Sequence, residues 1–324
     1  MDIYEKCREL FLQRLKETAV SKIFPSRERF LFAIQYAAEE KLGREETMRK
    51  RRVSTILAIS MTTAVALAAM DLARAQQSLT TQIAVPESAA LTQEKIPQPI
   101  RAAISAADRS TADKNLDAGR QPEQMLAFFG IQPGMKVADL WAGTGYSTEL
   151  LSRTVGANGL VYSQNPPFPP EFQMVADAWT ERLKNPTLKN ATAVSKPFDA
   201  ADFLPAPSGS LDAVLINMNY HDLVIRNIDR AKVNAAVAQA LKSGGVYAIV
   251  DHSAKDGSGV ADLQLHRIDE QFLISEVQKA GFTLAARSSA LRHAGDDRTW
   301  STSPRVAGER RGTSDRFMLL FKKP

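Results

Sequence analysis

Two neighbouring pairs of histidine and aspartate are the residues best suited to chemistry. His221-Asp222 follows an apolar stretch at 211–217, and Asp251-His252 follows another at 244–250. A histidine that a carboxylate orients can take a proton from a reacting group. Ligands of open α/β sheets bind outside the carboxyl ends of the strands. If both stretches are parallel strands, both pairs face one crevice.

The sequence leaves two interpretations of these pairs open. In one, His221 or His252 is a general base, oriented by its own neighbouring aspartate or by that of the other pair, with Tyr220 as a further catalytic candidate. In the other, the pairs are ordinary strand-end residues that cap helices. His266 and His293 are interpreted as structural or surface residues. Adjacent aspartate and histidine are not diagnostic of a metal site, so no metal ligand is predicted.

A glycine-rich turn between a strand and a helix is the most informative segment. Val137–Leu140 is a short apolar strand, Gly143-Thr-Gly145 a tight turn, and Ser147–Arg153 the start of a helix. This order is typical of the nucleotide-binding half of a doubly wound sheet. Glycine lets the backbone approach a ligand that a Cβ would exclude. Asp139, at the end of the strand, is predicted to point toward that ligand.

Residues 137–145 resemble motif I of class I S-adenosylmethionine-dependent methyltransferases, an acidic residue followed by a glycine-rich loop. The wider pattern from about 101 to 324 resembles a bacterial group of exported methyltransferases of unknown substrate. The segments that carry this wider resemblance are 117–122, 129–134, 219–222, 250–253 and 311–316. The resemblance implies an α/β, Rossmann-like, seven-stranded sheet, mostly parallel with an antiparallel last strand. It also implies S-adenosylmethionine as the cofactor, but no particular substrate.

The turn lacks the third glycine of the dinucleotide fingerprint, because Thr148 stands in its place. This departure counts against NAD and FAD, and so against a nicotinamide-dependent oxidoreductase. It does not count against adenosylmethionine, which has no pyrophosphate to seat at the helix end.

Further cofactor contacts follow from the resemblance. Asn165 ends the second strand, 159–165, where the family normally carries an acid for the ribose hydroxyls. An Asp in the loop after the third strand usually receives the adenine amino group, and Asp199 is the first choice, with Asp202 in reserve. The residues predicted to bind the cofactor are Asp139, Gly143, Gly145, Tyr146, Asn165, Asp199 and Asn217. Trp141 stands where the family often has glycine, and either stacks on the cofactor or packs in the core.

Two segments are predicted to cover the sheet edge. Residues 101–121 form a helical cover, in which Arg109 and Arg120 are anion contacts or solvated surface residues. Residues 288–314, which contain Trp300, Arg305 and Arg310-Arg311, form a long connection and are therefore a candidate lid or acceptor-binding segment.

The chain of 324 residues divides into four parts. Residues 1–47 are an N-terminal extension, interpreted as a mis-assigned start before Met48. Residues 48–75 have the basic region, apolar stretch and A-x-A ending of a secretory signal, with a membrane anchor as the alternative. Residues 76–100 are predicted to be a flexible linker, and 101–324 the methyltransferase domain. The protein is therefore expected to be exported and periplasmic, or membrane-anchored if the signal is not cleaved.

Composition excludes several functions. The net charge of +5 is concentrated in 48–75, so the remaining chain has no basic surface that would indicate nucleic-acid binding. Cys7 is the only cysteine, which excludes a disulfide framework or a cysteine nucleophile in the domain. The expected activity is methyl transfer to a small molecule, with a non-catalytic adenosylmethionine-binding protein as the alternative. The sequence predicts no oligomeric state.

Overall fold

A computed structural model of the protein describes Val85 and residues 87–324. The interpretations of 1–47 as an extension and of 48–75 as a signal or anchor concern residues outside this range. Within the described part of the chain, no helix combines the length and the apolar composition that crossing a membrane requires.

An eight-stranded sheet forms the centre of the domain. Its strands are β1 (Glu87–Ser88), β2 (Lys136–Leu140), β3 (Leu160–Asn165), β4 (Ala191–Ser195), β5 (Leu211–Asn217), β6 (Leu241–His252), β7 (Thr283–Ser288) and β8 (Arg316–Lys322). They lie in the order β1-β7-β8-β6-β5-β2-β3-β4. All pairings are parallel except those of β8, which is antiparallel to both β6 and β7. This arrangement confirms the predicted fold class of class I methyltransferases, with β1 as an additional short strand.

The domain begins earlier than the boundary predicted at residue 101. Glu87 and Ser88 pair with the edge strand β7, and Ile96 is only 1% exposed in the core. The backbone N–H and C=O of Leu91 are both hydrogen-bonded to the side-chain amide of Gln124. The prediction of a linker through residue 100 is therefore wrong from Glu87 onward, because these backbone and apolar groups are satisfied by the domain.

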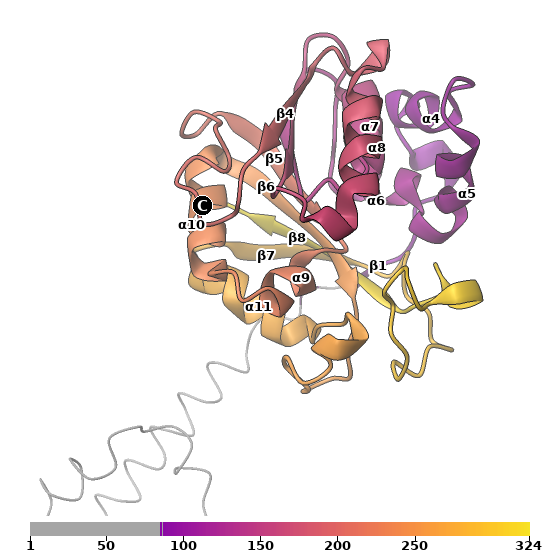
Figure 1. Ribbon diagram of the computed structural model, residues 1–324, viewed down its shortest axis with the longest axis vertical. Helices are drawn as coiled ribbons and strands as arrows, with labels where there is room; N and C mark the ends of the chain where they lie inside the picture. Colours follow the sequence, from indigo (N-terminus) through magenta and orange to yellow (C-terminus); the bar gives the residue numbers. More distant parts are fainter. Residues whose placement is uncertain (1–84, 86) are drawn as a thin grey trace, which may run out of the picture. The chain divides into compact units, whose positions relative to one another are not determined.

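Helices cover both faces of the sheet (Figure 1). They are α4 (Gln98–Ser105), α5 (Thr111–Arg120), α6 (Pro122–Phe128), α7 (Tyr146–Val155), α8 (Gln173–Leu183), α9 (Tyr220–Ile225), α10 (Arg230–Ala240) and α11 (Glu270–Lys279). Short 3₁₀ helices are η2 (Gln93–Lys95), η3 (Pro170–Phe172), η4 (Pro186–Leu188), η5 (Leu263–Leu265) and η6 (Gly308–Arg310). Side chains capable of capping stand at several helix starts: the Ser110 hydroxyl and the Asp269 carboxylate each accept a first-turn N–H.

The alternation of side chains along the strands produces two cores. On β5, Val214 and Ile216 point to the face covered by α9, α10 and α11. Ala213 and Leu215 point to the opposite face, covered by α4, α6 and α7. A strand buried on both faces is apolar along its buried length, as 213–216 is, and this is typical of a parallel sheet between two helical layers. Only the ends of the central strands are then open to a ligand.

Candidate active site

A cavity of about 1320 Å³ lies at the carboxyl ends of the central strands. Eight of the predicted site residues line it: Asp139, Gly143, Tyr146, Asp199, Asn217, His221, Asp222 and His252. The connection 289–315 between β7 and β8 contributes Trp300, Thr302 and Arg305, as expected of a covering segment. The volume exceeds the roughly 300–1,000 Å³ typical of a single small-molecule pocket. The cavity therefore has room for two small ligands.

The glycine turn is held by Asn165 from the neighbouring strand. The Gly143 N–H donates to Asn165 Oδ1 at 2.8 Å, and Asn165 Nδ2 donates to the Gly143 carbonyl at 3.1 Å. Gly143 has φ +58°, and a Cβ built there would meet no atom within 4 Å. Trp141, at φ +55°, has the backbone conformation that suits the glycine usual at its position, and its ring packs on Phe198. The turn thus exposes backbone to the cavity at Gly143.

Asn165 is therefore not a ribose ligand, contrary to the prediction. Its side chain is fully buried and does not line the cavity. Both polar atoms of its amide are used to close the turn onto β3. Within the described residues, the end of β3 presents no acid to the cavity.

Gly145, also predicted to contact the cofactor, does not line the cavity. A Cβ at this position would lie 2.7 Å from Cδ of Arg182 and 3.5 Å from the Trp179 ring, both on α8. Arg182 is held there by ion pairs with Asp113 and Glu149 at 2.5 and 2.6 Å. The glycine is required because α8 packs against the back of the turn.

Asp139, predicted to point toward the ligand, lines the cavity, but its side chain is almost completely buried. It accepts the Thr148 hydroxyl at 2.6 Å, and that hydroxyl is also 2.8 Å from Ser163 Oγ. Burial raises the pKa of Asp139 to about 7, although the hydrogen bonds from Thr148 favour the ionised form. Thr148, in the place of the third glycine, thus joins α7 to strands β2 and β3.

Asn217, at the end of β5, presents an unsatisfied acceptor beside the turn. Its Nδ2 donates to Ser147 Oγ at 3.1 Å, while its Oδ1 is buried without a partner. Asp199 is exposed at the rim of the same cavity. Asp202, the reserve choice, forms an ion pair with Lys196 and does not line the cavity.

Tyr146 lies between two arginines from the helical cover. Its hydroxyl donates to Asp117 at 2.6 Å, and Asp117 is paired with Arg109 at 2.7 Å. Burial raises the pKa of Tyr146, and the hydrogen bond to Asp117 acts in the same direction. Arg109 is thus a structural residue, whereas the Arg120 guanidinium lies 4.3 Å from the Tyr146 ring centre and lines the cavity.

His221 is oriented by the aspartate of the other pair. Its Nδ1 lies 2.7 Å from Asp251 Oδ1, and its backbone N–H donates to Asp251 Oδ2 at 2.9 Å. Burial opposes protonation of His221, but the charge of Asp251 and this hydrogen bond outweigh it and raise the pKa of the imidazole. With Nδ1 donating its hydrogen to the carboxylate, Nε2 is the unprotonated nitrogen, and it faces His266 Nδ1. Asp251 itself is fully buried and does not line the cavity.

His266, which the sequence assigned to a structural or surface role, lies at the site. Its Nδ1 is 3.3 Å from His221 Nε2 and 3.6 Å from Asp222 Oδ1. Thr302 fixes the backbone of this loop by donating to the carbonyls of Leu265 and His266. Burial and the charge of His221 lower the pKa of His266, while burial raises that of Asp222. No periodicity or spacing in the sequence indicates this approach, because it depends on the fold of the 253–269 loop.

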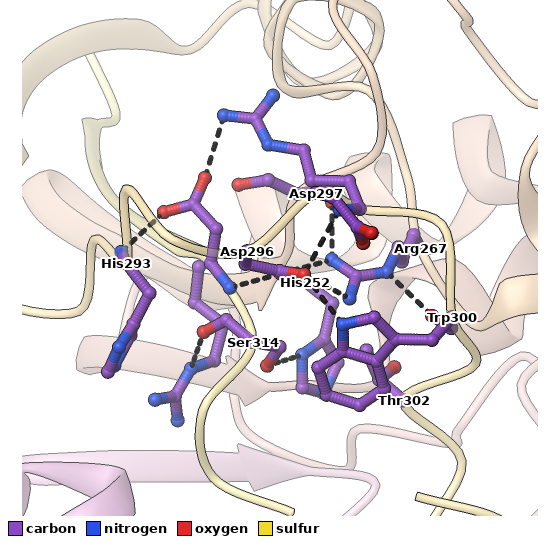
Figure 2. Close-up of polar contacts among 12 residues, drawn as sticks. His252, Arg267, His293, Asp296, Asp297, Trp300, Thr302 and Ser314 are labelled. Atoms are coloured by element: carbon purple, nitrogen blue, oxygen red, sulfur yellow. Dashed lines mark hydrogen bonds and ion pairs between the residues drawn. The ribbon is translucent and has the colours of Figure 1, made fainter. Parts of the chain in front are cut away.

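His252 faces a different partner from the one expected. Figure 2 shows its contact with Ser314. Its Nδ1 lies 2.8 Å from Ser314 Oγ, and its ring centre is 5.9 Å from that of His221. Burial lowers its pKa well below the usual value for histidine, and the charge of His221 adds to this. His252 is therefore a neutral imidazole beside the more basic His221.

Tyr220 is not part of the site. It is fully buried in the core on the α10–α11 side, where its hydroxyl accepts from Asn234 at 3.0 Å. Burial raises its pKa. Consecutive residues on α9 point in different directions, so the helix that turns His221 toward the cavity turns Tyr220 into the core.

His221, Asp222 and His266 together could hold a metal ion, since one ligand atom of each lies within 4.8 Å of the others. Two imidazole nitrogens bound to one tetrahedral zinc ion are about 3.3 Å apart, from bond lengths of about 2.0–2.1 Å. The separation of His221 Nε2 and His266 Nδ1 has this value. The geometry differs from the expectation of no metal ligand, because the group is formed by segments that are distant along the chain.

The comparisons with known proteins give distant structural similarity. No protein-family model and no curated protein matches the chain. The chain is similar to a SAM-dependent methyltransferase from Aquifex aeolicus, with 18% identity, a TM-score of 0.48, and coverage of 70% of this chain and 100% of that one. It is also similar to geranyl diphosphate C-methyltransferase from Streptomyces coelicolor A3(2) (15% identity, TM-score 0.46, 69% and 84% covered) and to the [4+2]-cyclase SpnF (12%, 0.47, 74% and 98%). Because one fold hosts many reactions, function must be inferred from the side chains of the site.

The buried carboxyl of Asp139 predicts an unusual dependence of stability on pH. With a pKa of about 7 in the folded protein against about 3.9 when unfolded, it binds more protons in the folded state between these values. Its contribution to the free energy of unfolding therefore falls as pH rises from 4 to 7. Asp139→Asn should gain stability relative to the wild type over this window, by up to about 1.4 kcal/mol per pH unit.

Urea unfolding of both proteins at several pH values measures this difference. A difference that does not change between pH 4 and 7 would show that Asp139 does not titrate in this range.

Proposed function

We propose that this protein binds S-adenosylmethionine beside the glycine turn and transfers its methyl group to a small-molecule acceptor on the side of His221. The observation that carries the proposal is the pairing of two features in one cavity. Gly143 exposes backbone where a Cβ would enter the cavity, and Asn217 Oδ1 is a buried acceptor without a partner. An unsatisfied buried polar atom is costly, and a ligand that donates a hydrogen bond removes that cost.

The residues around the glycine turn form the donor half of the cavity, and they suit the charge of adenosylmethionine. Its sulfonium and ammonium groups are cations, and the nearby groups of the protein are a carboxyl and a free amide oxygen, from Asp139 and Asn217. Asp199 at the rim is in a position to accept from the adenine amino group. The carboxylate that would bind the ribose is absent, because Asn165 serves the turn. Recognition of the donor therefore depends on the methionine and adenine ends.

The residues around His221 form the acceptor half of the cavity, and they suit removal of a proton from the acceptor. Bound adenosylmethionine supplies a methyl group already activated by the positive sulfur, so the protein has to align the acceptor and exclude water. As the new bond to the methyl carbon forms and the carbon–sulfur bond breaks, the acceptor loses its proton to His221 Nε2. The carboxylate of Asp251, at 2.7 Å from Nδ1, stabilises the resulting imidazolium. His221 is thus the proposed catalytic base, and Asp251 positions it.

The first prediction from this proposed function concerns donor binding. Calorimetry on the full chain should detect both adenosylmethionine and adenosylhomocysteine, and no binding of NAD. Gly143→Ala should weaken binding of the donor at least tenfold, about 1.4 kcal/mol, because its Cβ enters the cavity.

Gly145→Ala is the matched control, because its backbone is also left-handed but its Cβ meets Arg182 instead of the cavity. It should lower the unfolding temperature and leave donor affinity close to that of the wild type. Failure of the wild type to bind either adenosyl compound at millimolar concentration would exclude the proposed function. So would binding of NAD with comparable affinity.

The second prediction concerns turnover, measured as transfer of labelled methyl groups to the small-molecule fraction of a cell extract. His221→Ala should reduce it by about 10²–10⁴-fold, the usual contribution of a general base, without changing donor affinity. Donor binding without transfer by the wild type would instead identify a non-catalytic binding protein. Loss of activity on adding a chelator, with recovery on adding a metal ion, would contradict the role of His221 as proton acceptor.

The third prediction separates positioning by Asp251 from a purely structural role. Because the base must be neutral and Asp251 raises its pKa, wild-type activity should increase with pH through a value above about 6.5, the ordinary pKa of histidine. Asp251→Asn removes the charge and should move this rise to lower pH, with a reduced maximum rate. An unchanged midpoint in a variant that still binds the donor would assign the rise to another group.

A further inference from the structure

Arg120, Arg311 and Arg316 are three of the five arginines that line the cavity. Arg120 ends α5, Arg311 lies in the connection between β7 and β8, and Arg316 begins β8. They come from segments almost 200 residues apart in the chain. The positive charges of Arg120 and Arg311 repel one another, as do those of Arg120 and Arg316. The three guanidinium groups therefore form one positively charged cluster.

Close backbone contact brings these segments together. A Cβ built on Gly119 would lie 3.0 Å from the Cα of Gly312, which itself has φ +90°. Arg120 and Arg311 are the chain neighbours of these two glycines. Tyr146 then supports Arg120 through its ring, at 4.3 Å from the guanidinium. The position of the cluster is thus built by the fold and is not a chance gathering of surface side chains.

None of the three arginines forms an ion pair with a carboxylate of residues 87–324. The acids around them already have other arginine partners: Asp117 with Arg109, Asp113 with Arg182, Asp296 with Arg267, and Asp315 with Arg298. Arg316 is only 1% exposed, and its hydrogen bonds go to the carbonyls of Ser314 and Gly312. Burial and the charge of Arg120 lower its pKa to about 10.

A buried cation without a counter-ion is costly, because burial removes its hydration. This cost falls on Arg316, because Arg120 is half-buried and Arg311 is exposed. An anion bound in the cavity would give all three arginines a counter-ion. Guanidinium groups suit such a ligand, since their planar fork binds carboxylate or phosphate through two hydrogen bonds.

Arg316 places the cluster next to His252 and His221, while Arg120 packs on Tyr146 beside the glycine turn. Arg316 is paired with His252 across β6 and β8, and the His252 ring lies 5.9 Å from the ring of His221. The donor has one carboxylate but also an ammonium and a sulfonium, so its reactive end has a net positive charge. The single negative charge of the donor carboxylate cannot neutralise the three positive charges of the arginines.

We propose that Arg120, Arg311 and Arg316 form a binding site for an anionic group, carboxylate or phosphate, of the methyl acceptor. This inference rests on the proposed function for the identity of the ligand as an acceptor. It narrows the substrate class to small anions that carry the group to be methylated within reach of His221.

The experiment measures binding of inorganic phosphate to the full chain by calorimetry at constant ionic strength, with and without saturating adenosylhomocysteine. Phosphate should bind in both cases. Arg311→Gln and Arg120→Gln should each weaken phosphate binding at least tenfold. Arg316→Gln should do the same, but the first two variants decide the matter because Arg316 is buried and its replacement can prevent folding.

Arg310→Gln is the matched control, because Arg310 is the neighbour of Arg311 and exposed like it, but does not line the cavity. It should leave phosphate binding unchanged. Absence of phosphate binding to the wild type, or equal weakening in the control, would overturn the site. Displacement of phosphate by adenosylhomocysteine would assign the arginines to the donor carboxylate and overturn the acceptor assignment. Phosphate binding in a protein that ignores adenosylhomocysteine would instead remove the proposed function and leave the anion site.

Discussion

The acceptor half of the site depends on the hydrogen bonds that the carboxylate of Asp251 accepts. This carboxylate is fully buried at the end of β6 and accepts the backbone N–H groups of both His221 and His252, at 2.9 and 2.7 Å. It also lies 2.7 Å from Nδ1 of the His221 ring. One side chain therefore joins the segment after β5 to the end of β6, selects the His221 tautomer and raises its pKa. In a buried position these contacts have strict geometry, because each polar group left unsatisfied is costly.

The cavity contains two halves of different character. Around the glycine turn, polarity comes from exposed backbone, a buried carboxyl and the unsatisfied oxygen of Asn217, which suit a cationic donor. Elsewhere in the cavity, Arg120 of α5, Arg311 of the connection between β7 and β8, and Arg316 of β8 have no carboxylate partner among the described residues, which suits an anion. Both groups of side chains, and the three histidines His221, His252 and His266, line one cavity of about 1320 Å³.

Several residues that were predicted to lie at the site instead contact neighbouring segments of the fold. Asn165 stands at the ribose position, but its amide is used by the backbone of Gly143, and Gly145 is required by the packing of α8. Tyr220 is next to His221 in sequence and yet belongs to the core. In each of these cases the residue type was compatible with a ligand contact, and a contact made across the fold decided against it.

The sequence by itself determined the fold class and the edge of the sheet that holds the site. Apolar stretches of strand length, a glycine turn and regularly placed helices are local patterns, and they specify a parallel sheet whose strand ends carry the polar residues. Only the tertiary structure decided that Asp251 orients His221, that His266 joins them, and that Arg120, Arg311 and Arg316 meet. The physical reason is that a contact between distant segments depends on how loops close and helices pack, and no local pattern of residues encodes that geometry.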